Sequence, residues 1–202
     1  MSAGKSAQKH TYTLSDGTDL EEYRENHMWD FSKDYRSKKR LTPEDVSLIA
    51  SCMPKTLCRC LHLVHCGITD IGALKNMMND GMNLDLRGNK IADISALKGS
   101  NFHQLDLIGN EIVDISALKG SNIRMLFLAH NQIADISALN GSSIWICDLS
   151  RNQITDISDL IDLIGSLPDI WRLTVTNNQI TEDDKLLLRR ASFRKPGTII
   201  NV

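Results

Sequence analysis

The feature of this sequence that most constrains its fold is a segment of 21 residues that recurs through its middle. The pattern is L-x-L-x-x-N-x-I-x-D-I-x-x-L, and four close copies begin at Leu84, Leu105, Leu126 and Cys147. Two looser copies flank them and begin at Leu61 and Leu173. Repetition at a fixed period predicts a solenoid, in which each unit buries its apolar face only against its neighbours. The six copies therefore predict one stacked core.

Each position of the repeat predicts a structural role. The leucine pair, spaced by two, predicts a short strand whose leucines both point inward. A buried asparagine amide after the strand can satisfy backbone groups of neighbouring turns. The Asp-Ile-Ser segment predicts a short 3₁₀ or α turn capped by Asp or Ser. The step from Cys147 to Leu173 is 26 residues, five longer than the neighbouring steps of 21, which predicts a true helix over 158–164.

The two ends of the array carry helix signals. Thr42-Pro43-Glu44-Asp45 combines a hydroxyl cap, a proline at the first helical position and acids in the first turn, so a helix is expected from there to before Pro54. Thr181-Glu182 starts a last helix by the same logic. We therefore divide the chain into a polar N-terminal arm (1–41), a capping helix (42–57), six repeats (58–180) and a C-terminal cap (181–202). Some aromatic residues of the arm are expected to fold back onto the solenoid, and 198–202 is expected to be an apolar tail.

This pattern resembles the leucine-rich repeats of the regulatory subunit of protein phosphatase 1 and of bacterial internalins, which also carry N-x-I-x-D-I-x-x-L. The resemblance covers residues 58–180. It implies an α/β fold, namely a right-handed leucine-rich repeat solenoid with a parallel concave sheet, 3₁₀ or short helices on the convex side and helical caps at both ends. It also implies a protein-binding role. No residue of either family's binding sites can be matched here, so the resemblance does not identify a partner.

Composition limits the classes of function. The chain of 202 residues is 42% hydrophobic with a net charge of −2, which is typical of a soluble globular protein and argues against nucleic acid as the main partner. No run approaches the roughly 20 apolar residues of a membrane span, and the N-terminus lacks the apolar region of a secretory signal. Five cysteines, several at inward positions, indicate free thiols in a reducing compartment. A cytoplasmic location is therefore expected.

The densest group of possible metal ligands lies at the first repeat, in Cys58-Arg59-Cys60-Leu61-His62-Leu63-Val64-His65-Cys66. The strand register places Cys58 and Cys66 inward, and it places Cys60, His62 and His65 outward, so the five do not converge on one tetrahedron. No H-E-x-x-H, C-x-x-C or G-x-S-x-G motif occurs. We therefore expect neither an enzyme nor a cofactor, and a metal-dependent enzyme using the first repeat is the alternative.

Outward strand positions predict where a partner binds. Apolar residues adjoin one another only in the middle of the array, where Met125, Phe127 and Ile146 lie on adjacent strands with Ile108 and Ala129 just beyond. Adjoining exposed apolar residues are typical of a binding surface, and Phe127 is expected to be largely exposed. The full predicted partner-binding set is Asp106, Ile108, Met125, Phe127, His130, Ile146, Asp148 and Arg151. Two questions stay open: Trp145 and Trp171 either extend the surface or pack under the convex helix, and the N-terminal arm is an alternative cover for it. The Asp row at the central strand position is expected to be solvated.

The sequence therefore predicts a monomeric, non-enzymatic interaction module that binds another protein, and neither nucleic acid nor a membrane. A microbial effector delivered into a host cell is the second interpretation. Arg189-Arg190-Ala191-Ser192 resembles the substrate motif of basophilic kinases, which makes Ser192 a hypothetical phosphorylation site.

Overall fold

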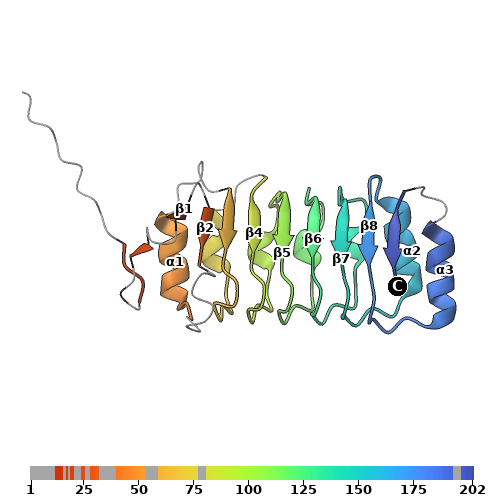
Figure 1. The fold of residues 1–202 in the computed structure, drawn as a ribbon, viewed down its shortest axis with the longest axis horizontal. Coiled ribbons are helices and arrows are strands. Elements are labelled where there is room, and N and C mark those ends of the chain that lie inside the picture. Colours follow the sequence, from red (N-terminus) through yellow and green to blue (C-terminus); the bar gives the residue numbers. More distant parts are fainter. Residues whose placement is uncertain are drawn as a thin grey trace, which may run out of the picture.

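The computed structural model describes residues 12–15, 17, 19–20, 24–25, 28–31, 40–52, 59–76, 81–192 and 197–202. Nine strands form one sheet in chain order, and Figure 1 shows them side by side from α1 at one end to α3 at the other. β1 is antiparallel to β2, and every later neighbour is parallel. The strands are β1 Arg24–Glu25, β2 Met28–Asp30, β3 Cys60–His62, β4 Asn83–Asp85, β5 Gln104–Asp106, β6 Met125–Phe127, β7 Ile146–Asp148, β8 Arg172–Thr174 and β9 Ile199–Asn201. The predicted fold class, a leucine-rich repeat solenoid, is confirmed. The sheet is uncurled (Figure 1), so the word concave does not describe it. We call the face of the sheet that points away from the buried leucines the open face.

The leucine pair of each repeat forms the core, as the alternation predicts. The first leucines pair in register across β3 to β8, with Cys147 in the place of one of them. All of these side chains are buried, and so are the second leucines of each pair. Each buried leucine contributes about 1.5–3 kcal/mol relative to an exposed one. The stack of these side chains therefore fixes which strand residues face outward.

The asparagine after each strand joins neighbouring repeats, as predicted. The Asn110 Nδ2 atom donates to the carbonyl oxygens of Leu86 and Leu107, at 3.0 Å each, and its Oδ1 accepts from the Ile91 backbone N–H at 3.1 Å. The same three bonds recur at Asn89, Asn131, Asn152 and Asn178. Buried backbone groups at the turn are thereby satisfied inside the solenoid.

The side of the solenoid opposite the sheet is built from short helices. These are η3 Gly72–Asn76, η4 Ser95–Leu97, η5 Ser116–Leu118 and η6 Ser137–Leu139. Before η4, the Asp93 carboxylate accepts a hydrogen bond from the Ser95 backbone N–H at 2.7 Å, and the Asp-Ile-Ser segments of the next repeats do the same. The long repeat forms a true helix, α2 (Ile157–Ser166), which confirms the prediction from its extra length.

Helix α1 (Pro43–Cys52) covers the N-terminal end of the core, where Val46 and Ile49 are buried. It begins with a reciprocal cap: the Asp45 backbone N–H donates to Thr42 Oγ1 at 3.2 Å, and the Thr42 N–H donates to Asp45 Oδ2 at 2.9 Å. Asp45 also accepts bonds from the N–H and hydroxyl of Ser15. Burial raises the pKa of the Asp45 carboxyl, but these hydrogen bonds outweigh it and the net pKa is lowered. The described part of the arm is thus docked onto α1.

Three strands in the sheet were not predicted, namely β1, β2 and β9. β2 pairs in parallel with β3, and it places Trp29 beside Leu61, so that Trp29 and Phe31 are buried where a repeat would have its leucines. β9 pairs with β8 and places Ile200 beside Leu173. The apolar tail expected over 198–202 therefore contains a strand, and its Ile200 and Val202 pack against the core.

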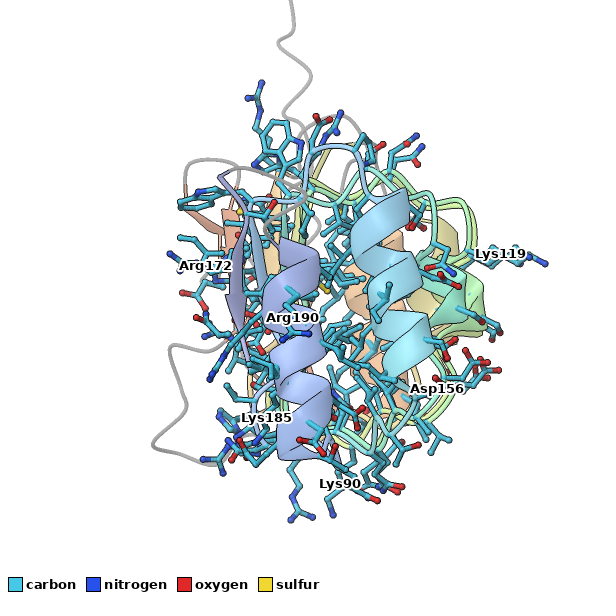
Figure 2. The ribbon with its side chains drawn as sticks, turned by 90° about the vertical axis from the view of Figure 1, so that its right-hand side faces the viewer. Lys90, Lys119, Asp156, Arg172, Lys185 and Arg190 are labelled. Carbon is cyan, nitrogen blue, oxygen red and sulfur yellow. The ribbon has the colours of Figure 1, made fainter. Side chains whose placement is uncertain are left out.

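Helix α3 (Glu182–Ser192) lies at the C-terminal end and packs against α2, with Leu188 buried. The end view of Figure 2 shows Arg172 on the sheet side of the molecule and Lys119 on the opposite side. The side chain of Ser192 lies outside the described residues, so its predicted modification stays a hypothesis. Within the described ranges, no helix combines the length and the apolar character needed to cross a membrane.

Candidate functional site

The open face carries one cluster of apolar side chains, which we call the open-face patch: Met125, Phe127, Trp145, Ile146 and Trp171. Met125 of β6 pairs in register with Ile146 of β7, and Phe127 pairs with Asp148. Met125, Phe127 and Ile146 are half-buried, so the expectation that Phe127 is largely exposed is wrong. The structure does bring the three predicted apolar residues together.

The two tryptophans extend the patch and do not pack under the convex helix. Trp145 and Trp171 are 43% and 50% exposed, and they lie on adjacent rungs because the Trp171 N–H donates to the Trp145 carbonyl at 2.8 Å. The guanidinium groups of Arg124 and Arg172 lie 4.9 Å from the ring centroids of Trp145 and Trp171, respectively. Such stacking holds a flat aromatic surface in place.

A hollow of about 580 Å³ opens beside these tryptophans. It is lined by Met125, Trp145, Ile146, Asp169 and Trp171. A hollow of this size with mostly apolar walls can accept one or two bulky side chains of a partner. The described residues of the N-terminal arm pack against α1 and β3, far along the sheet from β6. Residues 1–11 lie outside the described residues, so coverage of the patch by that segment is untested.

The acidic row beside Phe127 is less solvated than the sequence suggested. Asp85 and Asp106 are only 6% and 5% exposed, which corrects the expectation of a solvated row. Arg87 contacts both carboxylates: its Nη2 is 2.6 Å from Asp85 Oδ2, and its Nε is 3.4 Å from Asp106 Oδ2. Asp148, on the far side of Phe127, is half-buried and accepts a hydrogen bond from the Ser150 N–H at 2.9 Å.

Asp106 is the most perturbed carboxyl on this face. Burial raises its pKa from the ordinary value of 3.8 to about 6. The hydrogen bond from the Ile108 N–H and the charge of Arg87 act in the opposite direction, while the carboxylates of Asp85 and Asp148 raise the pKa further. Because Arg87 binds Asp85 at shorter distances than Asp106, one cation is shared unequally between two carboxylates. The charge of the Asp106 carboxylate is therefore less well compensated by Arg87 than that of Asp85.

The remaining predicted residues lie at the other end of the strands from the tryptophans. Ile108 is half-buried beyond β5, whereas His130 and Arg151 are exposed beyond β6 and β7. His130 and Arg151 adopt the left-handed conformation, with φ of 56° and 55°, at positions where Gly88 and Gly109 stand in earlier repeats. Ala129 is buried, which corrects its assignment to the exposed surface.

The first repeat does not assemble a metal site in the part of the chain that the structure describes. Cys60 and His62 are half-buried and His65 is exposed, but no group of three or more possible ligands converges there. Cys58 lies outside the described residues. Cys147 is fully buried, and burial raises the pKa of its thiol, so the thiolate is disfavoured. This cysteine packs as an apolar residue.

Sequence reasoning missed three residues of the site: Arg87, Arg124 and Asp169. Arg87 follows Asp85 by two, which puts both on the open face, and this spacing could have revealed the pair. Arg124 directly precedes β6 and is one rung from Trp145, so its stacking could also have been anticipated. Asp169 lies in the loop after α2, and no spacing in the sequence predicts its position beside the tryptophans.

Comparisons with known proteins agree with this architecture. The family model described as "Leucine Rich repeat" matches residues 59–75. No curated protein shows significant similarity to the sequence. Among solved structures, a leucine-rich repeat protein of Leptospira interrogans is 19% identical, with a TM-score of 0.53 over 81% of this chain and 52% of that one. Internalin C2 of Listeria monocytogenes is 23% identical (TM-score 0.45; 79% and 73% covered), and internalin F of the same species is 18% identical (0.43; 81% and 58%).

These likenesses concern the fold alone, since all three identities are low and this chain spans 52% of the Leptospira chain and 58% of internalin F. The fold is carried by this chain's own repeats, in which the leucine pairs, the asparagine bonds and the parallel register recur from β3 to β8. Together with the family match at residues 59–75 and the fold shared with the Leptospira protein, these repeats show that the chain has a leucine-rich repeat fold.

Proposed function

We propose that this protein is a non-enzymatic interaction module that binds another protein on the open face of its sheet, through the open-face patch. The observation that carries the proposal is the cluster itself: two tryptophans about half exposed border a hollow that Met125 and Ile146 also line. Leucine-rich repeat folds are generally scaffolds for protein binding. Aromatic and methionine side chains are also the types enriched at protein interfaces.

The energetics support an interface of this kind. Burying exposed apolar side chains against a partner is worth about 25 cal/mol per Å² of apolar surface, and aromatic residues dominate such interfaces. The rings at this site are already ordered by their arginine neighbours, so less side-chain entropy is lost on binding. Elsewhere on the described surface, large exposed apolar side chains such as Val113 do not adjoin a comparable aromatic pair.

Affinity capture with matched variants tests the proposal. Phe127→Thr and Trp171→Ala should each remove the captured partner, while Val113→Thr on the opposite side should retain it. Phe127→Thr is chosen because Thr174 occupies the same strand position two rungs away, so the sheet accommodates threonine there. Thermal unfolding of each variant is measured, and only variants that are folded at the capture temperature are compared. Retention of the same partner by both patch variants would refute the proposed surface.

We also propose that the protein works in a reducing compartment, the cytoplasm. None of the four described cysteines is in a disulfide, and Cys66 and Cys147 are buried in the core. If cells are lysed directly into denaturant that contains a thiol-labelling reagent, every cysteine of the protein should therefore be modified. A substantial fraction in a disulfide-linked form would contradict the location.

A further inference from the structure

We infer that the partner places a lysine or arginine side chain over the ring of Phe127, between Asp106 and Asp148, with a bulky apolar side chain nearby in the tryptophan hollow. This inference deepens the proposed function and rests on it. It concerns the chemistry of the partner, which the apolar character of the patch alone does not define.

The register gives the geometry of this cation site. Asp106, Phe127 and Asp148 are successive partners across β5, β6 and β7, and all three side chains project from the open face. Parallel strands lie about 4.8 Å apart, so the two carboxylates flank the ring at a mutual separation of roughly 10 Å. A cation over an aromatic face is attracted within about 6 Å of the centroid. One ammonium or guanidinium group can therefore contact the ring and interact with both carboxylates.

The basic side chains near this face are held by other groups and do not occupy the position over the Phe127 ring. Arg87 is held by Asp85 and reaches Asp106 only at the longer distance of 3.4 Å. Arg124 and Arg172 are stacked on their tryptophans. Among the described residues, no basic side chain forms an ion pair with Asp148. A cation from outside would add a favourable charge interaction with both carboxylates, since opposite charges at partly buried sites interact strongly.

The apolar half of the patch lies close enough for the same partner segment. Met125 and Ile146 precede Phe127 and Asp148 by two residues, which corresponds to roughly 7 Å along the strand. An extended segment has the same spacing between side chains at positions i and i+2. A basic residue and a bulky apolar residue two positions apart therefore fit the cation site and the edge of the hollow together.

A random dodecapeptide library displayed on phage and selected against the full chain tests this inference. Enriched peptides should carry Lys or Arg with a bulky apolar residue two positions away. A synthesised peptide of this type should bind Asp106→Asn and Asp148→Asn at least about tenfold more weakly than the original chain. Asp162→Asn, the same chemical change at an exposed position of α2, should leave the affinity unchanged.

The outcomes separate the inference from the proposed function. Peptides that lose binding to Phe127→Thr, but lack basic residues or ignore both Asp→Asn changes, would overturn the cation site and leave the open-face patch as the interface. Failure to enrich any peptide that depends on Phe127 would overturn both. Thermal unfolding of each variant confirms that it is folded, so a loss of binding cannot come from a loss of structure.

Discussion

Asp106→Asn should stabilise the free protein at neutral pH. The pKa of Asp106 rises from its ordinary value of 3.8 to about 6 in the folded protein. Since one pKa unit corresponds to about 1.36 kcal/mol, the ionised carboxylate costs the folded state about 3 kcal/mol. The carboxylate is only 5% exposed but lies at the surface of the sheet beside Arg87, so screening by solvent and by this cation reduces the figure. Asparagine has the same shape and can still accept the hydrogen bond from the Ile108 N–H, 3.2 Å from Asp106 Oδ1. The expected gain in unfolding free energy at pH 7.5 is about 1–3 kcal/mol.

The pH dependence gives the prediction its sign. Because the pKa is higher in the folded than in the unfolded protein, the folded state binds more protons between pH 3.8 and about 6, and the contribution of this group to stability falls as pH rises through that window. The gain from Asp106→Asn should therefore be complete above pH 7, fall to about half at pH 5 and be small at pH 4.

Urea unfolding at pH 7.5 and pH 5, followed by circular dichroism, measures this difference. Asp148→Asn is the matched control: it occupies the same strand position but is half-buried, so its effect should stay within about 1 kcal/mol. A neutral or destabilising effect of Asp106→Asn at pH 7.5 would show that Arg87 already compensates the buried carboxylate. That result would remove one of the reasons for expecting a cation from the partner.

Two further predictions concern the scaffold. Asn131→Ala breaks three buried hydrogen bonds and should lower the unfolding free energy by about 1–3 kcal/mol. Gln132→Ala, one residue outward, should change the unfolding free energy by less than about 0.5 kcal/mol. Equal shifts in the urea midpoint of the two variants would reject the register. Gly88→Ala should destabilise more than Gly99→Ala, because both glycines have positive φ but only the Cβ at Gly88 would overlap the imidazole of His65. The difference should disappear in a His65→Ala background, and a double-mutant cycle with no coupling would contradict that contact.

The sequence predicted the repeated part of the fold well because there each position has one physical role. Leucines such as Leu105 alternate with period two, and asparagines such as Asn110 must satisfy buried backbone groups, so the register of β3 to β8 follows. The additional strands β1, β2 and β9 were missed because the repeat pattern does not extend to them. Trp29 and Ile200 take the leucine place, but the Asn and Asp-Ile segments that mark a repeat are missing around them.

The site was predictable only as far as single strand positions determine it. Met125, Phe127 and Ile146 adjoin because the register says so. The ion pairs of the acidic row were not predictable from the alternation, because they depend on how the long side chain of Arg87 reaches Asp85 and Asp106 on neighbouring strands. Asp169 reaches the hollow through a loop whose path no repeat fixes.

Fluorine NMR of the chain labelled with 5-fluorotryptophan tests the central claim most directly, since the sequence has three tryptophans in two different environments. Trp145 and Trp171 are exposed at the open-face patch, whereas Trp29 is buried at the far end of the sheet. Single Trp→Phe variants assign the three resonances, and an unlabelled partner adds no signal. On adding the captured partner or a selected peptide, the resonances of Trp145 and Trp171 should shift and that of Trp29 should stay in place. Binding that leaves both exposed tryptophans unshifted would contradict the open face as the interface.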